Sequence, residues 1–150
     1  MNISLAIELL HNFTLIHDDI MDKDTIRHGK KTIHHKWDVS TAILAGDGIY
    51  TIAQLVLNTI DSKGKEIIKF FNEVTLDICE GQAMDKEFEN LDVISESLYL
   101  EMIKKKTGSL IVASAVLPSI YANEKMDNTE LFLTFGECLG KGFQIHDDFL

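Results

Sequence analysis

FTLIHDDIMD, residues 13–22, joins a helix-periodic run of apolar side chains to three closely spaced aspartates, and its tetrapeptide IHDD recurs at 145–148. Paired carboxylates in apolar surroundings are costly unless a cation neutralises them. On a helix, Asp18 and Asp22 project from one face, with Asp19 about 100° round. The repeat therefore predicts two sets of carboxylates that face one another across a helical bundle and bind magnesium together with a phosphate group.

Both acidic clusters fall late in their expected helices, where the negative end of the helix dipole disfavours anions. Gln144 precedes Asp147 and Asp148 by three and four residues, so an amide and carboxylates share one face. The alternative interpretation is a pair of solvated helix ends, which is weaker for two clusters than for one. His17 and His146 are interpreted as structural, although either could orient a neighbouring carboxylate.

The composition restricts the class of protein. The chain has 150 residues, 45% of them apolar, and a net charge of −10, which argues against nucleic acid or an anionic membrane as the main partner. Cys79 and Cys138 match no zinc or redox spacing and are expected to be reduced core thiols of a cytoplasmic protein. No run of 18 apolar residues is present, so we expect no membrane span.

The periodicity predicts helices throughout, with one proline, Pro118, and no convincing strand. Gly108 is expected to interrupt the pattern, and Ser40, Ser95 and either Asp127 or Asn128 are expected as helix caps. The expected helices are 3–22, 40–58, 65–90, 95–106, a stretch resuming after Gly108 to 121, and a last one from about 128 to the end; the connections include a polar loop at 23–38 and a loop at 123–128.

Basic residues gather beside the first acidic cluster. Five of the fourteen Lys and Arg residues lie within 23–36, in a chain that is otherwise acidic. Arginine pairs with phosphate oxygens through its planar fork, and lysine acts as a mobile point charge. A second group, Lys104 to Lys106, is either a further phosphate contact or an ordinary partner of a helix C-terminus. Carboxylates and a basic loop together predict a polyphosphate held by magnesium.

Six segments occur in a characteristic order: FTLIHDDIMD, IRHGKKTIHHKW, AILAGD, EGQAMD, KTGSL and GKGFQIHDDFL. In this order and spacing they resemble the trans-isoprenyl diphosphate synthases, the polyprenyl synthetase family, and most of all its archaeal-type geranylgeranyl diphosphate synthases. The resemblance implies an all-α isoprenoid-synthase bundle with a central cavity, a homodimer and three magnesium ions. It also implies a prenyltransferase that condenses isopentenyl diphosphate head-to-tail with an allylic diphosphate in isoprenoid biosynthesis.

The resemblance assigns roles residue by residue. Asp18, Asp22 and Asp147 resemble metal ligands, with Asp19 and Asp148 beside them. Arg27 resembles the arginine that grips the allylic diphosphate, and Lys106 and Thr107 resemble the lysine–threonine pair that contacts the same group. Gln82, Phe143 and Gln144 resemble residues of the substrate pocket. The residues with an implied catalytic role are Asp18, Asp22, Arg27, Lys106 and Asp147.

The chain departs from the family pattern at three points. His28 stands where many relatives have a second arginine for the homoallylic diphosphate, so this contact differs here. The upstream glycine–lysine–arginine segment of the family is absent, and the last aspartate of the second motif would follow Leu150. Residues 1–150 are therefore expected to be a single partial domain from the middle of a family member, without its N-terminal and C-terminal parts.

Phe13 is a candidate for the residue that limits product length. It precedes Asp18 by five residues, or about 7.5 Å along a helix axis at ~1.5 Å per residue. An aromatic residue at this position with a small neighbour such as Thr14 resembles the pattern of the family's archaeal-type geranylgeranyl diphosphate synthases. The resemblance implies a product of about twenty carbons. The alternative is that Phe13 is a plain core residue.

Three other functions remain open at this point. An HD-type phosphohydrolase is also helical, but it needs more histidines converging on its metal than the six present, five of which precede residue 36. A terpene cyclase shares the fold and the first motif, although the Asp147–Asp148 pair favours chain elongation. The chain could also be a non-catalytic subunit or an inactive fragment of a synthase, as the missing ends and His28 suggest.

Overall fold

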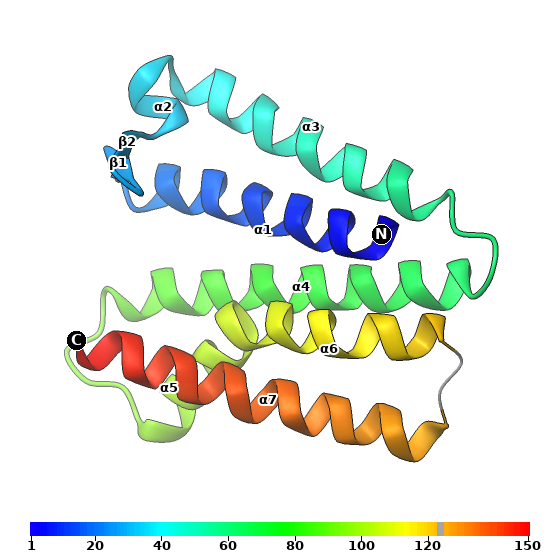
Figure 1. The fold of residues 1–150 in the computed structure, drawn as a ribbon. Helices are drawn as coiled ribbons and strands as arrows, with labels where there is room; N and C mark the ends of the chain where they lie inside the picture. The colour runs from blue at the N-terminus through cyan, green and yellow to red at the C-terminus, as the bar shows by residue number, and fades with distance from the viewer. Residues whose placement is uncertain (123–124) are drawn as a thin grey trace. The chain divides into compact units, whose positions relative to one another are not determined.

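The computed structural model describes residues 1–122 and 125–150, and α-helices form nearly all of their regular structure (Figure 1), as predicted. The chain divides into two compact units, Met1–Ile60 and Asp61–Leu150, called here the N-terminal and C-terminal units. The elements in order are α1 (Asn2–Met21), β1 (Ile26–Arg27), β2 (Lys30–Lys31), α2 (Ile33–Lys36), α3 (Val39–Leu57), α4 (Gly64–Phe88), α5 (Glu96–Ile103), the π-helix η1 (Lys104–Gly108), α6 (Ser109–Tyr121) and α7 (Met126–Phe149).

In the N-terminal unit, α1 packs against α3, which runs in the opposite direction (Figure 1). The fully buried residues of these two helices include Ala6, Ala42 and Ala53, and such small side chains let helices approach closely. Asp38, not the predicted Ser40, caps α3, because its carboxylate accepts hydrogen bonds from the backbone and hydroxyl of Thr41. These bonds lower the pKa of Asp38.

A small antiparallel hairpin lies within the polar loop predicted at 23–38. Ile26 pairs with Lys31 and Arg27 with Lys30, which leaves His28 and Gly29 as a two-residue turn. Both turn residues have positive φ, 50° for His28 and 74° for Gly29, as a type I′ turn requires. The backbone of the turn explains this departure from an all-helical pattern, because Gly29 adopts such angles without steric cost.

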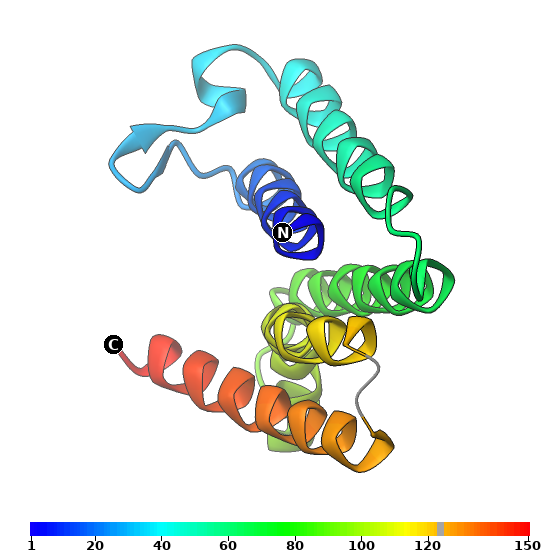
Figure 2. The same cartoon turned by 45° about the vertical axis from the view of Figure 1, so that its right-hand side comes forward.

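In the C-terminal unit, α6 lies between α4 and α7 (Figures 1 and 2). Its core is made by large side chains that are fully buried, among them Ile67 and Phe71 of α4, Ile103 of α5 and Leu117 of α6. Ser95 caps α5 as predicted, by accepting a hydrogen bond from the backbone of Leu98.

The backbone of the π-helix η1 packs closely against glycines of two neighbouring helices. A Cβ atom at Gly81 of α4 would overlap the backbone nitrogen of Lys106, and one at Gly140 of α7 would lie 2.6 Å from the Cα of Gly108. Gly136 of α7 makes the same kind of contact one turn away, against Val112. The predicted interruption at Gly108 takes the form of η1: the α-helical pattern gives way to a π-helix, and α5, η1 and α6 follow one another without a break.

Two further predictions are corrected. Helix α7 begins at Met126 with Lys125 at the N-cap, so neither Asp127 nor Asn128 is its cap; residues 123–124 of the predicted loop lie outside the described residues. Cys79 and Cys138 are free thiols, but both are exposed and not part of the core. Each lies on a helix face that its own unit does not cover.

Among the described residues, α3 has the length and composition of a helix that could cross a membrane. The core helices of many water-soluble proteins meet the same criterion, so this observation does not show a membrane span. The expectation that the chain has none stays a prediction.

The glycine contacts predict that Gly140→Ala destabilises the protein, because the new methyl group meets backbone atoms of η1 that cannot rotate away. We expect the free energy of unfolding to fall by about 1–3 kcal/mol, measured by urea denaturation followed by circular dichroism.

Gly142→Ala is the matched control on the same helix, because nothing lies within 4 Å of the position that a Cβ atom would take there. Alanine has the higher helix propensity, so this variant should gain up to ~1 kcal/mol. Equal stability of the two variants would contradict the proposed packing.

Candidate functional site

The first aspartate-rich motif lies at the end of α1. Asp18 and Asp19 belong to the last turn of the helix, and Asp22 is its C-cap. Asp19 is buried, with 6% of its surface exposed, whereas Asp22 is exposed. Carboxylates in the last turn face the negative end of the helix dipole, so their position costs stability unless a cation offsets it.

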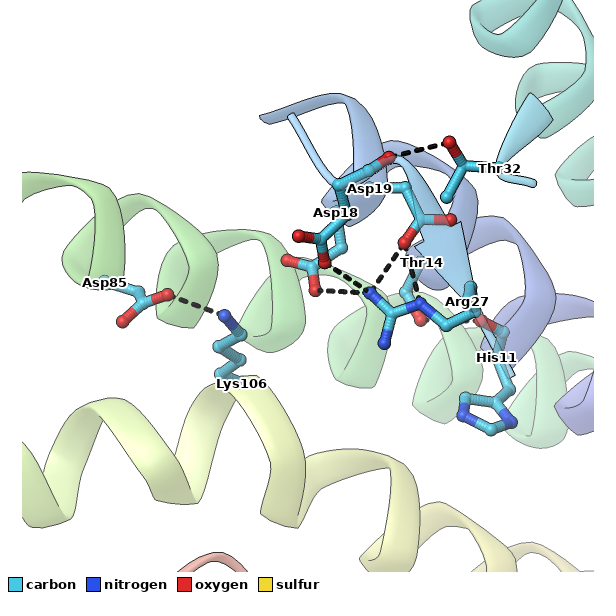
Figure 3. Close-up of polar contacts among 9 residues, drawn as sticks. His11, Thr14, Asp18, Asp19, Arg27, Thr32, Asp85 and Lys106 are labelled. Atoms are coloured by element: carbon cyan, nitrogen blue, oxygen red, sulfur yellow. Dashed lines mark hydrogen bonds and ion pairs between the residues drawn. The ribbon is translucent and has the colours of Figure 1, made fainter. Parts of the chain in front are cut away.

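Arg27 of β1 supplies that cation (Figure 3). Its Nε and Nη2 atoms both donate to Oδ1 of Asp19, at 2.7 and 2.6 Å, and Nη2 lies 3.8 Å from Oδ2 of Asp18. Asp24 accepts a longer hydrogen bond of 3.4 Å. Partial burial lowers the pKa of Arg27, but the hydrogen bond with Asp19 and the three negative charges outweigh this effect and raise it overall.

The hairpin that carries Arg27 is held by hydrogen bonds to the segment that joins α1 to β1. The hydroxyl of the buried residue Thr32 donates to the backbone carbonyl of Asp24 at 2.6 Å (Figure 3). The backbone N–H of Thr32 donates to the carbonyl of Thr25. The sequence reasoning placed Arg27 and Asp19 in one site, and the structure brings them into direct contact. His28, by contrast, is exposed at the tip of the turn.

Phe13 and His17 lie on the face of α1 that meets α3. The Phe13 ring is half-buried, with its centroid 4.6 Å from that of His17 and 5.2 Å from that of Tyr50. His17 passes over Gly46, where any side chain would overlap the imidazole, and its Nε2 lies 3.7 Å from Oδ1 of Asp47. These contacts agree with the structural interpretation of His17, whereas His146 is exposed.

In the C-terminal unit, the three consecutive lysines of η1 each pair with a different carboxylate. Lys106 lies 2.6 Å from Asp85 of α4, Lys105 lies 2.6 Å from Glu80 of α4, and Lys104 lies 2.8 Å from Glu137 of α7. Figure 3 shows the Lys106–Asp85 pair. Because the chain continues into α6, these lysines are not partners of a helix C-terminus; they hold η1 between two helices.

Thr107, Gln144 and Asp148 form a chain of hydrogen bonds. The Thr107 hydroxyl donates to Oε1 of Gln144 at 2.7 Å, and Nε2 of Gln144 donates to Oδ1 of Asp148 at 2.6 Å. Oδ2 of Asp148 accepts a hydrogen bond of 2.5 Å from the hydroxyl of Tyr99, which raises the pKa of Tyr99 to about 12. Residues predicted from separate motifs are therefore joined directly.

Other predicted residues in this unit are less engaged. Within the described residues, the Asp147 carboxylate has no hydrogen-bond or ion-pair partner, and the buried Nε2 of Gln82 has no hydrogen-bond partner. Phe143 is 57% exposed. A buried amide without a partner is rare in folded proteins, so Gln82 offers a donor to a bound group.

The carboxylates suit magnesium in kind, because this ion prefers hard oxygen ligands and is usually bound by one or two carboxylates plus a phosphate. Among the described residues, no three His, Cys, Asp or Glu side chains form a group placed to hold a metal ion. Asp18 and Asp22 belong to one unit and Asp147 to the other, so their joint use as ligands stays a prediction.

Three residues that position the predicted site residues were not predicted from the sequence. Asp24 joins Asp19 around Arg27, Gly81 makes room for the backbone of Lys106, and Tyr99 bonds to Asp148. The spacing of Asp24 and Arg27 could have indicated their pairing. No sequence signal links Tyr99 to Asp148, because the two residues are 49 positions apart on different helices.

The family model for polyprenyl synthetase matches residues 1–150, and the chain belongs to this family. It is similar to the geranylgeranyl pyrophosphate synthase of Geoglobus acetivorans, with 45% identity over 98% of this chain and 47% of that protein. It is also similar to the geranylgeranyl diphosphate synthase of Methanosarcina mazei, with 41% identity over 98% of this chain and 46% of that protein.

The fold is that of solved family members. A crystal structure of a geranylgeranyl pyrophosphate synthase superposes with a TM-score of 0.96 at 42% identity, over all of this chain and 46% of that one. The predicted isoprenoid-synthase fold is thus confirmed, and the HD-type phosphohydrolase is excluded. The chain spans about half the length of the curated relatives it matches.

The Arg27–Asp19 pair predicts that Arg27→Ala leaves a buried carboxylate without its cation, since only 8% of the Asp19 side chain is exposed. We expect the free energy of unfolding to fall by about 2–3 kcal/mol in urea denaturation, at the low end for a broken buried pair because Arg27 is partly exposed.

Lys30→Ala, an exposed change in the same hairpin, should stay within about 0.5 kcal/mol of the parent. The double change Asp19→Asn with Arg27→Ala should recover part of the loss, because it removes the buried charge. If Arg27→Ala is no more destabilising than Lys30→Ala, the pair does not stabilise the fold.

Proposed function

We propose that the protein containing this chain is a magnesium-dependent prenyltransferase that condenses isopentenyl diphosphate with an allylic diphosphate to make a short-chain product. Family membership supports this proposal, as do the names of the similar proteins. The observation that carries it is the presence of two cationic centres beside carboxylates, Arg27 at the first aspartate-rich motif and Lys106 with Thr107 next to the second.

The chain's own residues act in this reaction by binding and orienting the diphosphate. Ion pairs with Asp19 and Asp85 fix the positions of Arg27 and Lys106, respectively. The two cations can therefore present positive charge to a leaving diphosphate without having to reorganise. The Nε2 atom of Gln82 adds a neutral donor, whereas the Thr107 hydroxyl already donates its proton to Gln144. Asp18, Asp22 and Asp147 would hold magnesium, which when bound neutralises diphosphate charge and favours its departure.

The bond changes require no nucleophilic side chain. The bond between the allylic carbon and the diphosphate oxygen breaks, and the double bond of isopentenyl diphosphate attacks the allylic cation. A proton is then lost to the released diphosphate, which completes a five-carbon extension. The half-buried Phe13, packed against Tyr50, is proposed to limit the length of the growing chain near twenty carbons.

A homodimer in the cytoplasm completes the proposal. Helix α3 exposes several large apolar side chains, including Leu44 at 70% and Leu55 at 62%. An exposed apolar face of this kind suits a protein partner.

The assay uses the protein from its complete open reading frame with isopentenyl diphosphate and allylic diphosphates of increasing length. We expect product only with magnesium. The rate should fall at least about 100-fold in Asp18→Asn, because even mutation of a residue that only supports a metal ligand lowers metal affinity or activity 10- to 100-fold. Light scattering on the same sample measures the oligomeric state.

Asp61→Asn, an exposed change outside the motifs, is the matched control and should leave the rate unchanged. A folded protein without magnesium-dependent product would favour a non-catalytic subunit. Cyclic hydrocarbons from an allylic diphosphate alone would favour the terpene cyclase alternative.

Product length tests the role of Phe13. Phe13→Ala removes the ring that packs on His17 and Tyr50, so products longer than those of the parent enzyme should appear in chromatography. Phe13→Tyr keeps the bulk and should keep the product length. An unchanged length in the folded alanine variant would mean that Phe13 is only a core residue.

A further inference from the structure

Asp148 is held on both of its carboxylate oxygens by groups of the protein. Oδ1 accepts from Nε2 of Gln144 at 2.6 Å, and Oδ2 accepts from the hydroxyl of Tyr99 at 2.5 Å. Two donors, one from α5 and one from α7 itself, fix the carboxylate in both position and rotation. Each bond uses one lone pair of its oxygen, so Asp148 is engaged in a way that Asp147 is not.

Asp147 differs from its neighbour in every one of these respects. Both residues lie in the last turn of α7, but within the described part of the chain the Asp147 carboxylate has no hydrogen-bond or ion-pair partner. Neighbouring residues on a helix point about 100° apart. When the protein holds Asp148 on one side of the turn, the direction of Asp147 is fixed as well.

The hydrogen bonds continue from Asp148 to the group that is proposed to contact the diphosphate. Gln144, which donates to Asp148, accepts from the hydroxyl of Thr107 at 2.7 Å. Tyr99 of α5 is thereby linked through two intermediate side chains to η1. A chain of hydrogen bonds orients each side chain in it, because the donor at one end determines which atoms of the next side chain are left to bond further along the chain.

We propose that Tyr99 is a positioning residue for the second aspartate-rich motif, and that Asp148 acts as its relay and not as a metal ligand. The hydrogen bond from Tyr99 fixes the carboxylate of Asp148, so the neighbouring Asp147 points toward solvent. Through Gln144, Asp148 also orients the Thr107 hydroxyl. This inference rests on the proposed function and refines it, because it assigns different roles to the two aspartates of the pair.

The test is Tyr99→Phe in the protein from the complete open reading frame, a change that removes one hydroxyl and keeps the ring. Two quantities are measured. The first is hydrogen–deuterium exchange of the backbone at 141–150, which should become faster because the last turn of α7 loses its link to α5. The second is kcat with saturating substrates, which should fall about 10-fold, the low end of the loss expected when a residue that supports a metal site is removed.

Tyr121→Phe is the matched control, since Tyr121 lies at the end of α6 and its side chain is 53% exposed. It should change neither quantity. Asp147→Asn and Asp148→Asn separate the two aspartates: the first should abolish magnesium-dependent turnover, and the second should resemble Tyr99→Phe. Adding Tyr99→Phe to Asp148→Asn should then have little further effect.

The possible results are distinct. Unchanged exchange in Tyr99→Phe overturns the proposal, and so does faster exchange with an unchanged kcat, because the bond would then be structural only. Equal and complete loss in both aspartate variants would make Asp148 a ligand and overturn its relay role. If the parent protein makes no product, the proposed function fails, while faster exchange confined to Tyr99→Phe still supports the positioning link.

Discussion

The close backbone contact of η1 with two flanking helices is the constraint on which the C-terminal unit depends. A Cβ atom at Gly81 of α4 or at Gly140 of α7 would overlap the backbone of η1. The backbone at Lys106 therefore packs directly on α4, and the backbone at Gly108 packs directly on α7. π-Helices are uncommon and often occur at functional sites. Here the turn presents Lys106 and Thr107 from a backbone that cannot move without moving both helices.

In the N-terminal unit a different structure positions the cation. A short hairpin with a type I′ turn returns Arg27 to the last turn of α1, where it neutralises the buried carboxylate of Asp19. The two units therefore use the same principle, a cation fixed by carboxylates, on different scaffolds. A charge that is already oriented costs little further reorganisation when it meets a diphosphate.

Much of the fold and of the candidate site could be predicted from local pattern. Apolar periodicity indicated the long helices, because their buried faces recur every three or four residues, and Ser95 was recognisable as a cap from its chemistry. The missed features depend on contacts distant in sequence. Gly108 was expected to interrupt the helical pattern, but the sequence did not indicate that the interruption is a π-helix whose backbone packs against Gly140.

The sequence by itself determined the helical class, the position of both acidic motifs at helix ends and the residue types that suit magnesium and diphosphate. These follow from periodicity and side-chain chemistry, which are local. Only the tertiary structure decided which carboxylate each cation pairs with, and that Asp148 is engaged on both oxygens while Asp147 is not. The physical reason is that a hydrogen bond between α5 and α7 depends on how helices pack, which no short stretch of sequence encodes.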